Sequence, residues 1–435
     1  MAPRRKTTIF RRAQRAPQQR QIERSNTTKA LQAGNVKLCY ASYTLAGSDG
    51  DGDKENQDCL TVEVLRDRDA PPVVFFGVFD GHGEHGGTVA ALAAEQLPQF
   101  VDEQHPQDGE PALALMSGFS SIQQFLLQQP GLDCSLSGCT AVVALLVEDT
   151  LVVANAGDSR CLAGRFEGGA EVVAYELTND HTPALLHEAN RILASGGRIA
   201  PLQFGGTAVG PPRVWERGAD QPGLCITRSL GDTHAKRLGV SHAPEVSTFE
   251  LTAGDRYLAL VSDGITEFMS SQEIIDKIHK WASAGTMPHE VARRLVREAR
   301  SRWKEFGDEG IVDDCTAVVG YLVYDQEEEE EQMEGEKDSK DSKKKRMKQK
   351  KKTKAAAAAA AARRLQGGGA GASGSGGGGD DGDVAGGAAA SSMVREQERT
   401  LGQQVSALWT TMRRALSGKK KEKEAAKRKE GEDKV

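Results

Sequence analysis

The stretch that decides the fold reads Val73-Val74-Phe75-Phe76-Gly77-Val78-Phe79-Asp80-Gly81-His82-Gly83. Its first seven residues are β-branched, aromatic or glycine, which is typical of a buried strand. The run stops at Asp-Gly-His-Gly, which predicts a tight turn. A carboxylate and an imidazole are therefore expected at a strand end, beside glycines whose backbone can approach a bound ion closely. For this stretch alone an ordinary polar turn is the alternative, because Asp-Gly is a common turn dipeptide.

Length and composition narrow the class of protein. A chain of 435 residues predicts one to three domains, since domains usually hold about 100–200 residues. No stretch approaches the roughly 18–20 apolar residues of a membrane span. The N-terminus also lacks the apolar segment of a secretory signal. The net charge of −6 is unevenly distributed and indicates no particular class of partner.

The seven cysteines bear on the compartment. Their number is odd, their spacing is scattered, and no Cys-x-x-Cys occurs. This argues against a disulfide framework or a structural zinc site and favours a reducing compartment, cytoplasmic or nuclear. We expect the cysteines to serve as small core hydrophobes.

Composition divides the chain into three parts. Residues 1–33 are rich in arginine and are expected to form a basic disordered arm. Organelle targeting by this arm stays open, because transit peptides are also rich in arginine and poor in acids. Residues 34–325 intersperse strand-like and helix-like runs and are expected to fold. Residues 326–435 are acidic, lysine-rich, polyalanine and Gly/Ser/Asp tracts that cannot bury enough apolar surface to offset chain entropy.

One part of the tail has helical periodicity. Apolar residues recur at helical spacing within residues 399–417, which predicts a short amphipathic helix. The helix is a candidate for docking a partner or for autoinhibition. A marginal isolated helix is the alternative, because short helices are unstable without packing. Upstream, Lys343–Lys354 fits a nuclear-import pattern or solvated low complexity equally well.

Periodicity predicts the elements of the folded part. Expected strands are Val36–Leu45 (half-buried), Cys59–Leu65, Val73–Phe79, Thr140–Val147, Leu151–Ala154, Tyr257–Val261 and Cys315–Tyr324. Expected helices are Thr88–Phe100, Ala112–Gln128, Leu185–Ser195, Gln272–Ala284 and His289–Phe306. Gly205–Gly223 contains glycine and proline and is expected to be a loop.

Acidic residues recur at the ends of these strands. Asp80, Asp158 and Asp263 follow apolar runs, while Asp58 and Asp313 precede them. One such acid is usually a helix or turn cap, but several in one domain suggest that their side chains meet at one site. Clustered carboxylates repel one another unless cations neutralise them, and oxygen ligands suit magnesium or manganese. Two such metals can clamp a phosphoryl group. No glycine-rich nucleotide loop is present, so ATP is not the indicated substrate.

A set of short motifs makes the sequence familiar. In chain order they are Glu55-Asn56-Gln57-Asp58, Val78-Phe79-Asp80-Gly81-His82-Gly83, Ser137-Gly138-Cys139-Thr140-Ala141, Asn155-Ala156-Gly157-Asp158-Ser159-Arg160, Asp180-His181-Thr182-Pro183, Thr227-Arg228-Ser229-Leu230-Gly231-Asp232, Ala243-Pro244-Glu245-Val246, Ser262-Asp263-Gly264-Ile265 and Asp313-Asp314-Cys315-Thr316. Each motif is weak alone. Together and in this order, over about residues 35–325, the chain resembles the type 2C metal-dependent serine/threonine protein phosphatases.

The resemblance implies a fold and a metal site. The fold is α+β, a four-layer α/β/β/α sandwich with a central pair of antiparallel sheets flanked by helices. Two Mg²⁺ or Mn²⁺ ions would bind at one edge, with Asp80 bridging both and the Gly81 carbonyl holding one. Asp263 and Asp313 would hold the other. Asp158, with Asp263, resembles the optional third metal site of the family.

The resemblance also implies a reaction, the hydrolysis of phosphoserine and phosphothreonine by a water that bridges the two metals. Asp58 would orient that water from behind the metal ligands. His82 would be the general acid that protonates the leaving oxygen, a role that imidazole suits near neutral pH. The expected partners are phosphorylated proteins, with no obligatory nucleic acid, and the protein is expected to be a monomer.

Two departures from the family pattern matter. Gln57 stands where many members have a metal-contacting glutamate, so one site loses a negative charge. Asp53 stands where the family has a phosphate-binding arginine, and the adjacent Lys54 is the candidate substitute. A lysine offers a point charge where arginine offers a bidentate fork. These departures support an alternative function, a pseudophosphatase that binds phosphoproteins as a scaffold.

Overall fold

The run from Val73 to Phe79 forms strand β5, and all seven of its residues are buried. The structure, a computed structural model, describes residues 27–324 except 50, 51, 53, 67–71, 105–109, 169, 170, 308 and 309. The predicted tail, the predicted helix at 399–417, residue Asp53 and most of the basic arm lie outside the described residues.

Strand β5 lies inside a five-stranded antiparallel sheet, beside the hairpin that the strands expected at Thr140–Val147 and Leu151–Ala154 form. In order across the sheet the strands are β16 (Glu245–Glu250), β9 (Thr150–Ala156), β8 (Ala141–Val147), β5 (Val73–Phe79) and β4 (Cys59–Arg66).

A second antiparallel sheet has six strands. In order they are β1 (Lys29–Ala33), β2 (Val36–Leu45), β19 (Cys315–Tyr324), β17 (Asp255–Val261), β10 (Arg160–Phe166) and β11 (Val172–Glu176). Strand β1 extends the folded part into residues 29–33, N-terminal of the boundary expected at residue 34. Its five residues pair with β2, and Ala33 is buried in the core between the sheets. The basic composition of the preceding residues hid this strand from the sequence analysis.

The two sheets share a core, which explains why β5 is apolar on both faces. Successive side chains of a strand point to opposite faces. Phe76 and Val78 therefore pack between the sheets, against Leu258 and Val318 of the six-stranded sheet. Phe75 and Phe79 point the other way, into the core that the five-stranded sheet shares with helices α1 (Gly86–Gln104) and α2 (Pro111–Leu127).

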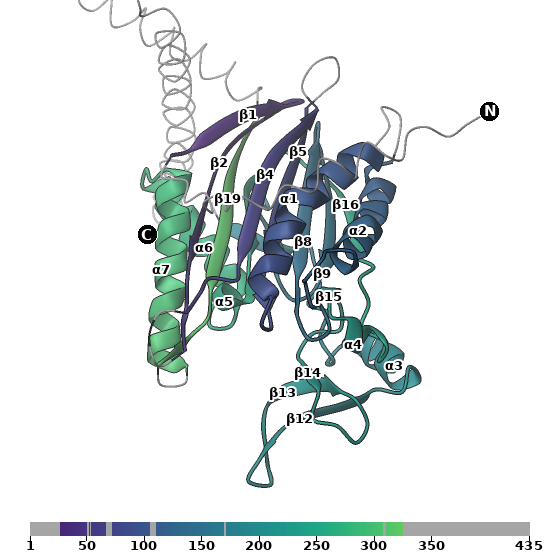
Figure 1. Ribbon diagram of the computed structural model, residues 1–435. Helices are drawn as coiled ribbons and strands as arrows, with labels where there is room; N and C mark the ends of the chain where they lie inside the picture. The colour runs from purple at the N-terminus through teal and green to yellow at the C-terminus, as the bar shows by residue number, and fades with distance from the viewer. Residues whose placement is uncertain are drawn as a thin grey trace, which may run out of the picture. The chain divides into compact units, whose positions relative to one another are not determined.

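The outer face of the six-stranded sheet packs on helices α6 (Ser271–Ser283) and α7 (Pro288–Phe306). Figure 1 shows these helices along one side of the fold and α1 and α2 along the other. Strand β2 is consequently buried on both faces, and the expectation of a half-buried strand was wrong. The α+β class with antiparallel sheets is confirmed. No described helix is both long enough and apolar enough to cross a membrane.

Residues 198–224 form a small three-stranded sheet where the sequence predicted a loop. The strands are β12 (Arg198–Phe204), β13 (Thr207–Trp215) and β14 (Pro222–Leu224). The prediction failed because most of β13 is exposed and so shows no apolar alternation. In Figure 1 this sheet projects from one end of the fold, next to helices α3 (Leu186–Ala194) and α4 (Thr233–Lys236).

Short strands complete the fold. The remaining elements are β3 (Ser48–Asp49), β6 (Gly81–His82), β7 (Gly138–Cys139), β15 (Leu230–Gly231), β18 (Ile311–Val312) and helix α5 (Asp263–Thr266). All seven cysteines are free, and all but Cys225 are buried. The cysteines therefore pack as core residues, as the sequence predicted.

Candidate metal centre

The register of the sheets brings the strand-end acids together. Cys59 pairs with Phe79 across β4 and β5, so Asp58 and Asp80 leave these strands at the same end. In the other sheet Val261 pairs with Arg160 and with Ala317. The segments that carry Asp158, Asp263 and Asp313 therefore leave β10, β17 and β19 at one end as well.

The electrostatics of three acids indicate that they are close. Asp58 is fully buried, whereas Asp80 and Asp263 are partly exposed. Loss of solvent raises the pKa of Asp80 well above its usual value, and the charges of Asp58 and Asp263 raise it further. Loss of solvent, followed by the charge of Asp313, also raises the pKa of Asp263, although a hydrogen bond with Asp80 opposes the shift. Carboxyl groups with pKa values raised in this way either keep a proton or are held ionised by cations beside them.

Unpartnered oxygens test whether these acids suit a metal. Ser262 Oγ donates to Asp58 Oδ2 at 2.9 Å, but the buried Oδ1 atoms of Asp58 and Asp263 have no hydrogen-bond donor among the described residues. Burying a carboxylate oxygen without a hydrogen-bond donor costs free energy unless a cation binds that oxygen. No group of three or more His, Cys, Asp or Glu side chains in the described part has the geometry of a complete metal site. The oxygen-only chemistry nevertheless fits Mg²⁺ or Mn²⁺.

Asp313 and Lys54 form an ion pair beside this cluster. Lys54 Nζ lies 2.7 Å from Asp313 Oδ1 and 3.5 Å from Asp314 Oδ2. Burial lowers the pKa of Lys54, but the two carboxylates outweigh it and raise the pKa above its usual value. The candidate phosphate-binding lysine is therefore charged and lies among the acids.

Asp314 is a functional residue that sequence reasoning missed. It is buried and accepts hydrogen bonds from the backbone N–H groups of Gly47 at 2.7 Å and Gln57 at 2.9 Å. It thereby fixes the loop that carries Asp58. Its place in the Asp313-Asp314 motif was the available signal, but the sequence could not reveal that the two acids have different partners.

Asp158 belongs to the same end of the fold. Loss of solvent raises the pKa of Asp158 well above its usual value, followed by the charges of Asp263 and Asp180. Asp158 therefore lies near Asp263, as the family pattern for a third metal site implies. Arg160 holds Asp180 with a hydrogen bond of 2.6 Å from Nη2, and its charge opposes the rise in the pKa of Asp158.

The turn after Asp80 requires glycine. A Cβ atom at Gly81 would lie 2.5 Å from the Gly86 carbonyl oxygen and 2.6 Å from that of Gln57. Gln57 Nε2 donates to the Gly83 carbonyl at 2.8 Å. Gln57 therefore ties this turn to the loop of Asp58, a bond that a glutamate at this position could not donate.

His82 contacts an acid that was not predicted as a site residue. Its Nε2 lies 2.8 Å from Asp232 Oδ2, and Asp232 is buried. The motif Thr227–Asp232 was noticed in the sequence, but no local pattern indicated which of its residues reaches His82, 150 positions away.

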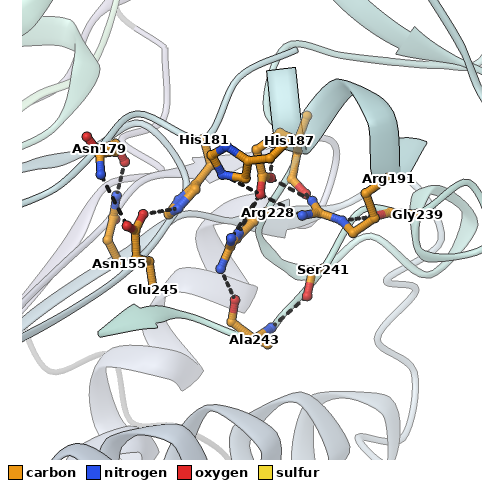
Figure 2. A network of polar contacts seen from close by, with 12 residues as sticks. Asn155, Asn179, His181, His187, Arg191, Arg228, Gly239, Ser241, Ala243 and Glu245 are labelled. Atoms are coloured by element: carbon orange, nitrogen blue, oxygen red, sulfur yellow. Dashed lines mark hydrogen bonds and ion pairs between the residues drawn. The ribbon is translucent and has the colours of Figure 1, made fainter. Parts of the chain in front are cut away.

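A second polar network holds this motif to helix α3, and Figure 2 shows it. Glu188, fully buried on α3, accepts Arg228 Nη2 at 2.9 Å and Arg191 Nη1 at 2.6 Å. Thr227 Oγ1 donates to its second oxygen at 2.5 Å. Burial would raise the pKa of Glu188, but these hydrogen bonds lower it to about 2. His181, the family-motif histidine, is buried beside this network and bonds Glu245 at 3.0 Å.

Comparisons with known proteins agree with this geometry. The sequence profile described as "Protein phosphatase 2C" matches residues 48–305, a range that ends before Asp313. The Oryza sativa subsp. japonica protein named "Probable protein phosphatase 2C 12" is 30% identical over 344 residues, covering 69% of this chain and 85% of that protein. The Arabidopsis thaliana protein named "Probable protein phosphatase 2C 35" is 32% identical, covering 66% and 84%.

A solved structure shares the fold. The serine-threonine phosphatase 2C of Toxoplasma gondii superposes with a TM-score of 0.54 at 22% identity, over 68% of this chain and 98% of that one. At this identity the similarity establishes the architecture alone.

Proposed function

The chain belongs to the protein phosphatase 2C family and is a metal-dependent protein serine/threonine phosphatase; from this premise we propose which of its residues carry the reaction. The observation that carries the proposal is the convergence of Asp58, Asp80 and Asp263, from three segments, with unpartnered oxygens on two of them. The substrates are phosphorylated proteins.

We propose that Asp80 and the Gly81 carbonyl, with Asp263 and Asp313, hold two Mg²⁺ or Mn²⁺ ions. Asp158 with Asp263 would hold a third. When bound, such ions supply a water activated for attack on phosphorus and neutralise charge on the phosphoryl group. Asp58, held by Ser262, is suited to accept a hydrogen bond from that water through its free Oδ1.

We propose that His82 donates a proton to the serine or threonine oxygen as it leaves. A partly exposed imidazole at the strand end can reach a bound phosphoester. Lys54 is proposed to supply the positive charge that the family places on an arginine. Its pairing with Asp313 means that it would have to exchange this carboxylate for the phosphoryl oxygens.

Several broader features belong to the same proposal. The arrangement of two sheets between two helix pairs supports the four-layer α/β/β/α sandwich that the family resemblance implies. We further propose a monomer in the cytoplasm or nucleus, with a single catalytic domain that adds β1 (Lys29–Ala33) to the residues 34–325 expected from the sequence, and with a tail segment that docks a partner. The scaffold alternative is not favoured, because the carboxylates of the centre are present.

Hydrolysis of a phosphothreonine peptide by the full-length chain tests the proposal. We expect phosphate release with Mn²⁺ or Mg²⁺ and none in EDTA. Asp80→Asn is expected to lower kcat at least about 100-fold, since it removes a charge that holds the catalytic ions. Asp276→Asn, on the exposed face of α6, is the matched control and should retain full activity. Release that persists in EDTA would contradict the proposal.

A further inference from the structure

Asp232 is placed to control one particular nitrogen of His82. Its Oδ2 lies 2.8 Å from His82 Nε2, and only 3% of its side chain is exposed, against 27% for His82. A carboxylate accepts hydrogen bonds and donates none when ionised. Nε2 must therefore carry a proton to make this contact, which leaves Nδ1 as the other nitrogen of the ring.

The carboxylate of Asp232 is held in place from several sides. Ser229 Oγ donates to Oδ2 at 2.6 Å, and Lys236 Nζ donates to Ser229 Oγ at 3.0 Å. The backbone of Asp232 adopts the left-handed region (φ 47°, ψ 51°), a conformation that costs energy and persists where its surroundings fix it. A Cβ at Gly138 would lie 2.2 Å from Oδ2, so only glycine leaves room for the carboxylate there.

The charge of Asp232 is also fixed. Burial would raise its pKa, but His82, Lys236 and Ser229 outweigh burial and hold the pKa below its usual value. The carboxylate is therefore ionised at neutral pH and stays an acceptor.

The segment that carries Asp232 is fastened to α3. Arg228, four residues before Asp232, bonds Glu188 at 2.9 Å, and Thr227 bonds the same carboxylate at 2.5 Å. The Ser229 N–H donates to the Ser241 carbonyl at 2.9 Å. These bonds fix the position of Asp232 independently of His82. A residue that orients another needs such an independently fixed position.

We propose that Asp232 is a positioning residue that holds His82 by Nε2–H and turns Nδ1 toward the leaving oxygen of the substrate. This inference rests on the proposed function of His82 as general acid. In the step, a water forms the new bond to phosphorus as the P–O bond to the serine or threonine oxygen breaks. The electron pair of the broken bond stays on that oxygen, which takes the proton from Nδ1. The ring is left neutral, with its remaining proton on Nε2 bonded to Asp232. Water is the only co-reactant.

The test compares two substrates whose leaving groups differ in their need for an acid. The leaving group of a phosphothreonine peptide is a basic alkoxide that needs protonation. The leaving group of p-nitrophenyl phosphate is a stabilised phenolate that does not. General acid catalysis contributes about 10²–10⁴-fold. We therefore expect Asp232→Asn and Asp232→Ala to lower kcat on the peptide about 10- to 100-fold, with less than about a 3-fold change on p-nitrophenyl phosphate and little change in KM.

Two controls separate positioning from general damage to the fold. Asp255→Asn removes another buried aspartate, which pairs with Arg165 at 2.8 Å at the opposite end of β17, and should slow neither substrate selectively. In a His82→Ala background, the Asp232 substitutions should have no further selective effect, because the two residues act as a unit. Equal losses on both substrates, or additive losses in the double variants, would overturn the proposal.

A measurement on the metal-free wild-type chain decides the matter without turnover. The ¹⁵N shifts of the nine histidines, assigned for His82 by comparison with His82→Ala, report which ring nitrogen carries the proton at mildly alkaline pH. We expect Nε2–H in the wild type and loss of this preference in Asp232→Asn. A proton on Nδ1 in the wild type would refute the positioning role. If the wild type instead has Nε2–H but releases no phosphate, the proposed function fails, and only the orientation of the His82 ring by Asp232 remains supported.

Discussion

Among single residues, Gly81 has no room for a side chain. Alanine would place a methyl group 2.5 Å from the Gly86 carbonyl oxygen, a backbone atom that can move only with α1. Overpacking of this kind typically costs about 1–3 kcal/mol. We expect Gly81→Ala to lower the free energy of unfolding by that amount and to weaken Mn²⁺ binding, as measured by denaturant titration and calorimetry.

Gly87→Ala is the matched control for this substitution. It lies at the start of the same helix, where an added Cβ would meet its nearest neighbour at 3.6 Å, an ordinary contact. Stability there should stay the same or rise by up to about 1 kcal/mol, since alanine favours the helix over glycine. A comparable loss in both variants would show that the close approach at Gly81 is not the cause.

Glu188 gives a second prediction at this scale. Glu188→Gln leaves the guanidinium groups of Arg191 and Arg228 without their carboxylate, which should cost about 1–3 kcal/mol. Because hydrogen bonding lowers the pKa of Glu188 from 4.5 to about 2, its contribution is present above the higher value and is lost as pH falls toward the lower. Thermal melts should therefore show the gap between variant and wild type closing between pH 5 and pH 2.

Glu290→Gln is the control for Glu188. Glu290 also pairs with two arginines of its own helix, but on the surface of α7. Exposed pairs contribute about 0–1 kcal/mol, so this variant should melt close to the wild type. A gap for Glu188→Gln that stays constant with pH would contradict the charge-based account.

Among the elements, strand β5 allows a test of how much its burial on both faces stabilises the fold. Phe75 and Phe76 are both fully buried, although they face different cores. Either substitution to alanine should lower the free energy of unfolding by about 3–5 kcal/mol. Thr248→Ala, at an exposed position of β16, should change the free energy of unfolding by less than about 0.5 kcal/mol. A small effect at only one phenylalanine would show that one of its cores relaxes.

The elements that the sequence predicted are those with a strong apolar run or a clear apolar periodicity. Strands β2, β5 and β19 match the expected ranges residue for residue, because most of their residues are apolar and buried, although the sequence did not show that β2 is buried on both faces. Strands β10, β11 and β16 were not predicted. In β10, arginine and glycine interrupt the apolar run, and β16 has no fully buried residue. Pairing partners, rather than the local pattern, decide such strands.

The same contrast applies to the site. Acids at strand ends could be selected from the sequence because turn and strand signals are local. The contact of Asp232 with His82, the role of Asp314 and the pairing of Lys54 with Asp313 depend on segments 150 to 267 residues apart. Local patterns carry no information about such distances.

The whole molecule balances stability against the cost of its clustered acids. Like charges a few ångströms apart at an effective dielectric constant near 20 repel by several kcal/mol at most. Removing one should therefore stabilise the metal-free fold. We expect Asp80→Asn to raise the Tm in EDTA, whereas Mn²⁺ should raise the Tm of the wild type and have little effect on the variant.

Differential scanning calorimetry of both proteins, with and without Mn²⁺, checks this expectation. Ligand at about 100 times Kd adds about 2.7 kcal/mol to stability, which sets the scale of the wild-type shift. Asp276→Asn should follow the wild type in both conditions. A variant Asp80→Asn that melts lower in EDTA would mean that Asp80 contributes more by packing than it costs by repulsion.

The position of β19 has a consequence for how the protein is made. It is the last described strand in the chain, yet it lies inside the six-stranded sheet, between β2 from near the start and β17. A nascent chain emerging from the ribosome therefore holds β2 and β17 with open edges until residue 324 has left the exit tunnel. Unpaired edges of this kind invite aggregation. Asp313, which directly precedes that strand, joins the other acids only when the strand closes the gap, so we expect the metal centre to stay incomplete through nearly all of the synthesis of the folded part.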